Sequence, residues 1–229
     1  MKKIIMVLGL VGAMGVATAQ ESKTKVEIGA KAGMNVANVN YDVDYSMPDT
    51  EEKIGLSLGA YAEIQLSDRW SVQPEILYSE QGFKQSGYLE GDFPYGDSEL
   101  PFEGNVEITE KINYLKVPVM MKYYTGEGRK FFLEAGPELG VNISAKAKTE
   151  LDGYSNSTRI KGSNTTDIKD YIEGVDFALN FGLGYKFNDK FNIGVRWGIG
   201  LTDFDKTSDK QYNYVGTIGV GYTFWSNQK

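Results

Sequence analysis

Six charged residues are the side chains of this chain best placed to do chemistry. They lie in segments in which every second residue is apolar, and they occupy the intervening positions, which are otherwise small or polar. They are Glu63, Glu75, Lys116, Lys122, Glu134 and Arg196. The carboxylates Glu63, Glu75 and Glu134 could act as an acid pair or line an ion path. The alternative is a structural network of paired charges, because an unpaired charge in a closed interior carries a large desolvation cost. We predict the structural network.

Histidine and cysteine are both absent from the chain. Histidine-based acid–base catalysis, serine–histidine triads and thiol nucleophiles are therefore excluded. A carboxylate pair of the kind that glycosidases use stays open, although no spacing marks one. We predict a non-enzymatic protein with no catalytic, cofactor-binding or metal-binding residues.

The elements that would position the charges are clearest between Phe177 and Leu201. Every second residue of Phe177–Phe187 and of Phe191–Leu201 is apolar or aromatic, and Asn188-Asp189-Lys190 separates the two runs. Alternation with period two predicts β-strands, and a short polar turn between two of them predicts an antiparallel hairpin. Each run has 11 residues, which matches the roughly 9–11 that a tilted strand needs to cross a bilayer.

The composition of the second face of this hairpin indicates which side meets lipid. That face is mostly glycine, with asparagine and an occasional lysine or arginine. The outer face of a soluble barrel would instead carry many lysines and glutamates and few glycines. We therefore expect the apolar face to point outward and the small, polar face to fill a narrow lumen.

Eight such strands are expected along the chain. They are Val26–Val36, Ile54–Leu66, Trp70–Gln81, Ile112–Tyr124, Lys130–Asn142, Phe177–Phe187, Phe191–Leu201 and Tyr212–Phe224. Long and short connections alternate between them, as in bacterial outer-membrane barrels with short periplasmic turns and long outer loops. The sequence predicts an all-β, eight-stranded antiparallel up-and-down transmembrane β-barrel with both termini in the periplasm. Pro74, Pro118 and Pro137 predict bulges or gaps in the strand ladders.

The N-terminus predicts export from the cytoplasm. Lys2 and Lys3 precede an apolar run from Ile4 to Val16, and Ala17-Thr18-Ala19 follows it. This pattern is typical of a secretory signal peptide over residues 1–19, with the barrel domain over residues 20–229. Loss of the two lysines leaves 22 basic against 31 acidic residues, a formal charge of −9. Such acidity argues against nucleic acid as a partner.

Several motifs resemble those of the PorT-like outer-membrane β-barrel family common in Bacteroidota. They are GAKAGMNVAN (Gly29–Asn38), WSVQPEILYSEQGFK (Trp70–Lys84), NYLKVPVMMKYY (Asn113–Tyr124), FLEAGPELG (Phe132–Gly140) and GLTDF (Gly200–Phe204). The resemblance covers nearly the whole mature chain in order. It implies an eight-stranded barrel in the outer membrane and says little about activity, because function does not follow from fold.

The expected function is a structural or surface-interaction role. The long outer loops are acidic, and the second and third, Gly82–Lys111 and Ile143–Gly174, are the expected contact surface. Outer-membrane lipid and lipopolysaccharide are the expected partners, with surface or periplasmic proteins as further candidates and no cofactor. Two alternatives stay open. A narrow solute or ion channel would need a continuous water path through the lumen, and an accessory of a protein-secretion apparatus would need a stable partner.

Overall fold

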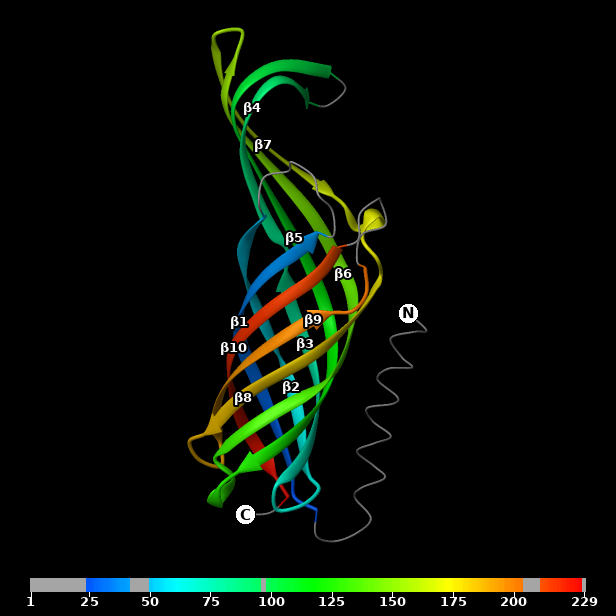
Figure 1. The fold of residues 1–229 in the computed structure, drawn as a ribbon, viewed down its shortest axis with the longest axis vertical. Coiled ribbons are helices and arrows are strands. Elements are labelled where there is room, and N and C mark those ends of the chain that lie inside the picture. The colour runs from blue at the N-terminus through cyan, green and yellow to red at the C-terminus, as the bar shows by residue number, and fades with distance from the viewer. Residues whose placement is uncertain (1–23, 42–49, 96–97, 204–210, 228–229) are drawn as a thin grey trace.

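The computed structural model describes residues 24–41, 50–95, 98–203 and 211–227, so the expected signal peptide lies outside it. Eight strands form a closed antiparallel ring in which β10 pairs with β1. In ring order they are β1 (Val26–Tyr41), β2 (Thr50–Gln65), β3 (Trp70–Gln81), β5 (Ser98–Thr125), β6 (Phe131–Ser155), β8 (Val175–Lys186), β9 (Phe191–Gly200) and β10 (Gln211–Ser226). The predicted antiparallel barrel is confirmed, and Figure 1 shows it as a tilted cylinder of strands.

Two further strands bring the described total to ten. They are β4 (Phe83–Tyr95) and β7 (Thr158–Asp167). β4 pairs with β5, β5 with β6, and β6 with β7, so four antiparallel strands continue past the ring. We call β4, β7 and the parts of β5 and β6 that pair with them the outer arm. Figure 1 shows that the arm rises from the barrel end opposite to the C-terminus.

The outer arm corrects the sequence prediction at the second and third long connections. We expected irregular loops over Gly82–Lys111 and Ile143–Gly174, but most of both segments is β-strand. The hairpin between β6 and β7 turns at Asn156 and Ser157, whose φ angles are +48° and +68°. Two central residues with positive φ form the turn that matches strand twist. Asn-Ser signals such a turn far more weakly than Asn-Gly, so the sequence pattern did not reveal it.

The two faces of the barrel strands divide as predicted. Apolar residues on the outward face, such as Met34, Phe177 and Ile218, are about half exposed in the isolated chain. Charged and amide residues on the other face, such as Glu27 and Asn35, are buried in the lumen. The apolar outer surface is the surface that a bilayer covers.

The three prolines interrupt the ladders without changing the register. Ladder pairs are missing beside Pro74 between β2 and β3, beside Pro118 between β3 and β5, and beside Pro137 between β5 and β6. The same register resumes after each gap, so the predicted ladder gaps are confirmed and bulges at these prolines are not found. The register shifts lie elsewhere, at Ile28/Gly29 and at Asn113/Tyr114.

Aromatic side chains gather at the barrel end that carries the short turns. Trp70 and Tyr123 lie with ring centroids 4.9 Å apart, and so do Phe191 and Tyr222. Aromatic girdles of this kind flank the apolar band of outer-membrane barrels at the membrane interface.

The described helical segments, η1 (Glu127–Arg129) and η2 (Lys169–Tyr171), are single turns. Within the described ranges, no helix is long and apolar enough to cross a membrane.

Candidate functional site

A layer of four charged side chains crosses the middle of the lumen. Lys31, Glu75, Glu134 and Arg196 come from β1, β3, β6 and β9, which are every second strand around the ring. Arg196 donates to both carboxylate oxygens of Glu75, at 3.0 and 2.8 Å, and through Nε to Glu134 Oε1 at 2.9 Å. Lys31 Nζ lies 2.9 Å from Glu75 Oε1. We call these four residues the central layer.

The central layer balances its charges and is largely buried. Two cations face two carboxylates, and Glu75 and Arg196 are 2% and 8% exposed. The fork of the guanidinium matches both oxygens of Glu75, which is the strong, bidentate form of an ion pair. Because the layer reaches four sides of the ring, its contacts cross-brace the barrel through the lumen.

A second group closes the end of the lumen next to the short turns. Glu63 accepts hydrogen bonds from Tyr124 Oη at 2.6 Å, Arg129 Nη2 at 3.2 Å and Lys122 Nζ at 3.4 Å. Lys186 Nζ lies 2.6 Å from Glu27 Oε2.

Arg129 belongs to the turn between β5 and β6, and it folds back across this end of the lumen. Its guanidinium also donates to the backbone oxygens of Ser67 and Asp68, and it lies 3.9 Å from the ring centroid of Tyr124. A residue of a short turn thus plugs the barrel end.

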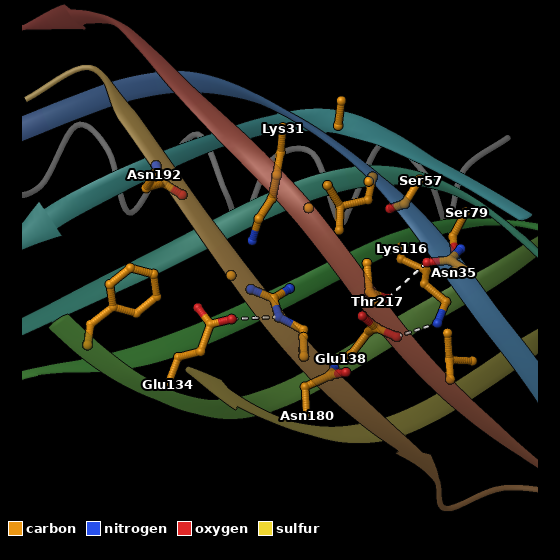
Figure 2. A pocket seen from close by; sticks show the side chains of 18 residues that line it. Lys31, Asn35, Ser57, Ser79, Lys116, Glu134, Glu138, Asn180, Asn192 and Thr217 are labelled. Carbon is orange, nitrogen blue, oxygen red and sulfur yellow. Dashed lines mark hydrogen bonds and ion pairs between the residues drawn. The ribbon is translucent and has the colours of Figure 1, made fainter. Parts of the chain in front are cut away.

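A small cavity lies beside the central layer. Its volume is about 50 Å³, and its lining includes Glu134, Lys116 and Asn180 (Figure 2). Lys116 Nζ pairs with Glu138 Oε1 at 2.6 Å. Glu134 Oε2 and Asn180 Nδ2 are buried and have no hydrogen-bond partner among the described residues. The cavity is large enough for water, which would satisfy these two groups.

Apolar side chains pack together at the end of the barrel that carries the outer arm. Phe83, Ile112, Tyr114, Ala145 and Ile172 pack together, each no more than 4% exposed. They come from β4, β5, β6 and the segment after η2. This cluster adds apolar packing to the polar contacts of the lumen.

The structure places all six predicted charged residues inside the lumen, in three groups. Glu75, Glu134 and Arg196 share the central layer, Glu63 and Lys122 lie toward the short turns, and Lys116 pairs with Glu138 beside the cavity. The three candidate carboxylates are therefore not together, because Glu63 lies apart from Glu75 and Glu134. Sequence reasoning did not find Arg129, because nothing in a turn sequence shows that a side chain folds back into a lumen.

The face of the outer arm that continues the outer surface of the barrel is polar. Direct cross-strand partners align Ser86, Glu107, Glu150 and Ser163 in one row across the four strands. The next row aligns Tyr88, Asn105, Asp152 and Lys161. An open groove of about 710 Å³ runs between the two rows. We call it the arm groove.

Two side chains along the arm groove have shifted pKa values with local causes. Tyr88 Oη donates to Glu103 Oε1 at 2.8 Å, and this bond raises the pKa of Tyr88 because it stabilises the protonated phenol. Arg159 Nη2 donates to Asp152 Oδ1 at 3.1 Å, which lowers the pKa of Asp152. Tyr88 is therefore held as a neutral ring and Asp152 as a carboxylate near neutral pH.

Within the part of the chain that the structure describes, no group of three or more acidic side chains is arranged to hold a metal ion. The acidic residues of the arm groove are instead matched to lysines. Glu107 Oε1 lies 3.4 Å from Lys84 Nζ, and Glu150 Oε2 lies 2.8 Å from Lys148 Nζ.

The family described as "Outer membrane protein beta-barrel domain" matches residues 18–206, most of the chain. The chain belongs to this family. Its place is therefore the outer membrane, and the apolar belt of the barrel is its lipid-facing surface. The family match does not extend to the PorT-like group, so that narrower resemblance stays a prediction.

Solved outer-membrane proteins give weak similarities. The attachment invasion locus protein Ail of Yersinia pestis is 15% identical, with a TM-score of 0.45, and the match covers 89% of this chain and 100% of Ail. Neisserial surface protein A is 12% identical, with a TM-score of 0.46 and 86% and 97% covered. CarO of Acinetobacter baumannii is 11% identical, with a TM-score of 0.44 and 86% and 98% covered. No curated protein sequence matches the chain.

Proposed function

We propose that this outer-membrane barrel is a non-enzymatic surface-interaction protein whose lumen is a plug and whose outer arm is the contact surface. The carrying observation is the central layer, in which Arg196 bridges Glu75 and Glu134 across the lumen. The contacts of Arg129 at one end and the apolar cluster around Ile112 at the other support the same proposal, because both add side chains to the interior. A barrel of eight strands leaves an interior that side chains fill.

We place the short turns and both chain ends on the periplasmic side, with the outer arm outside the cell. Short turns on the periplasmic side and long extensions outside are the rule for bacterial barrels. Outer-membrane lipid and lipopolysaccharide then surround the apolar belt. Surface proteins could reach the arm, and periplasmic proteins could reach the short turns.

Single-channel recording of the purified protein in planar bilayers tests the plugged lumen. We expect no steady conductance from a barrel that is folded, as shown by its heat-modifiable migration on a gel. Conductance steps that change in Glu75→Gln or Arg196→Gln would reject the plug and assign transport to the lumen.

A narrow channel is the second candidate. The cavity next to Glu134 favours it, because Glu134 Oε2 and Asn180 Nδ2 are polar groups that water would satisfy. This cavity would have to join both ends of the lumen, through the layer of Arg196 and through the apolar cluster. The third role, as an accessory of a secretion apparatus, is tested by recovery of a stable partner in a cross-linked pull-down.

A further inference from the structure

The arm groove stands well outside the lipid-facing belt. On β6 the outward apolar run ends near Val141, and Glu150 follows nine residues later on the same strand. At about 3.3 Å per residue, the groove begins roughly 30 Å farther along the strand. Its occupant therefore comes from the aqueous phase outside the membrane.

Polar side chains supply the groove with hydrogen-bonding groups at close spacing. The eight residues of the two rows provide three carboxylates, two serine hydroxyls, an amide, a phenol and one ammonium. The two aliphatic residues that contribute backbone to the floor, Val106 and Leu151, alternate with these side chains, and Leu151 is buried. The core of a protein–protein interface is apolar, so this surface lacks what a protein partner needs.

Two carboxylates lie side by side along one edge of the groove, and their repulsion costs stability. Glu107 and Glu150 are direct cross-strand partners on β5 and β6, and like charges in that position destabilise a sheet. Each has one oxygen bound to a lysine, so the other oxygen of each is without a hydrogen bond from the described residues. These oxygens are acceptors that a ligand rich in hydroxyl groups can satisfy.

One exposed tyrosine ring lines the groove, and a second lies in the next row of the sheet. Tyr88 and Tyr154 are 63% and 54% exposed. Both neighbour Glu103: Tyr88 by its hydrogen bond, and Tyr154 as the direct cross-strand partner. An aromatic ring presents a negative face, which attracts the polarised C–H groups of a sugar ring.

We propose that the arm groove binds a soluble, neutral polysaccharide. Sugar hydroxyls donate to the carboxylates of Glu107, Glu150 and Asp152, and a sugar ring stacks on Tyr88. The second oxygens of Glu107 and Glu150 need hydrogen-bond donors, which the hydroxyl groups of a neutral sugar supply and the acidic groups of an anionic polymer do not. The lysines bound to Glu107 and Glu150 disfavour a divalent cation. This inference rests on the proposed role of the arm as the contact surface, and it names the class of partner.

Retention on immobilised dextran, mannan and amylopectin tests the proposal, with alginate as the anionic comparison. The refolded full-length protein is kept in an amine-oxide detergent, because the sugar headgroups of glucoside detergents would compete. We expect binding to at least one neutral polysaccharide and none to alginate. Tyr88→Ala should weaken binding about tenfold, the scale of one lost aromatic anchor, and Glu150→Gln should weaken it too.

Tyr171→Ala is the matched control, because Tyr171 is equally exposed but lies in η2, outside the groove. Heat-modifiable migration shows that each variant folds. The proposal is wrong if no neutral polysaccharide binds, or if Tyr88→Ala and Tyr171→Ala bind alike. If the protein binds only to vesicles that carry long-chain lipopolysaccharide, the ligand is the sugar chain of a membrane lipid, and the proposal of a soluble polysaccharide is wrong. A silent lumen in planar bilayers together with failed polysaccharide binding would overturn this inference alone and leave the plugged barrel standing.

Discussion

At the scale of single residues, Arg196 holds the central layer together. Its guanidinium carries three of the hydrogen bonds in the layer and neutralises two carboxylates from different strands. Lys31 contacts only one oxygen of Glu75, because its ammonium lacks the two parallel N–H donors of a guanidinium. The layer thus depends on a planar, bidentate cation, and a lysine in place of Arg196 could not reproduce the same bonds.

Removal of that cation should weaken the barrel strongly. We predict that Arg196→Ala lowers the free energy of unfolding by about 3–5 kcal/mol, because Glu75 and Glu134 then stay buried without their main partner. Urea titration of the protein in lipid vesicles, followed by tryptophan fluorescence, measures the loss. Arg159→Ala is the control, and it should leave stability nearly unchanged because solvent screens the exposed Arg159–Asp152 pair. Equal effects of the two variants would contradict a stabilising role for the layer.

At the scale of the elements, close strand contact occurs where β5 and β6 lose ladder pairs beside Pro137. Gly136 lies in this gap, and a Cβ there would collide with the backbone oxygen of Val119 and lie 2.9 Å from Met120 Cα. Gly140 faces the same lumen from the same strand, yet its nearest contact would be Tyr114 Cδ1 at an ordinary 3.4 Å.

The two glycines should therefore respond differently to the same substitution. We predict that Gly136→Ala costs about 1–3 kcal/mol of stability, the usual range for overpacking, whereas Gly140→Ala costs much less. Urea midpoints of the two variants in vesicles provide the measurement. If Gly140→Ala were as costly as Gly136→Ala, the close approach at the ladder gap would not be the cause.

These glycines also illustrate how far sequence reasoning extends. Period-two alternation depends only on which residues face lipid, so it predicted the barrel class, the ring strands and the inward direction of residues such as Glu134. It could not separate Gly136 from Gly140, because the difference arises from how two strands approach each other. It also missed the outer arm, because one face of that sheet is polar and only a few apolar residues, such as Phe102 and Leu151, are buried on the other, too few to impose a clear alternation. Arg129 was missed because contacts across the lumen leave no trace in local spacing.

At the scale of the whole molecule, the lipid-facing belt fixes the barrel in the membrane. Val195 faces outward on β9, directly between Leu183 and Ile218 of the neighbouring strands. We predict that Val195→Arg lowers stability by about 2–4 kcal/mol, the cost of a cation on the lipid face near the bilayer midplane. Thr165→Arg places the same charge on the exposed arm and should cost nothing measurable in vesicle unfolding. A Val195→Arg protein as stable as the parent would reverse the assignment of inside and outside.

The outer arm pairs with β2 only through Phe83, Lys84 and Gln85. Beyond residue 86 the described residues of the arm pair only with one another, so the barrel should fold without the distal part of the arm. Ser86 pairs with Glu107, and Glu150 pairs with Ser163. Replacing residues 87–106 and 151–162 each by Asn-Gly joins these partners through two-residue turns that suit strand twist. The ring pairs, the central layer and the apolar cluster around Ile112 all remain in this trimmed protein.

We predict that the trimmed protein inserts into vesicles, migrates as a heat-modifiable barrel and unfolds within a few degrees of the parent. It should lose polysaccharide binding completely, because Tyr88, Asp152 and Tyr154 are removed together. Trimming each hairpin alone separates their contributions, since Tyr88 lies in one and Asp152 in the other. A trimmed chain that fails to fold would mean that the arm helps to build the barrel, and the division into a plugged anchor and a contact surface would then be wrong.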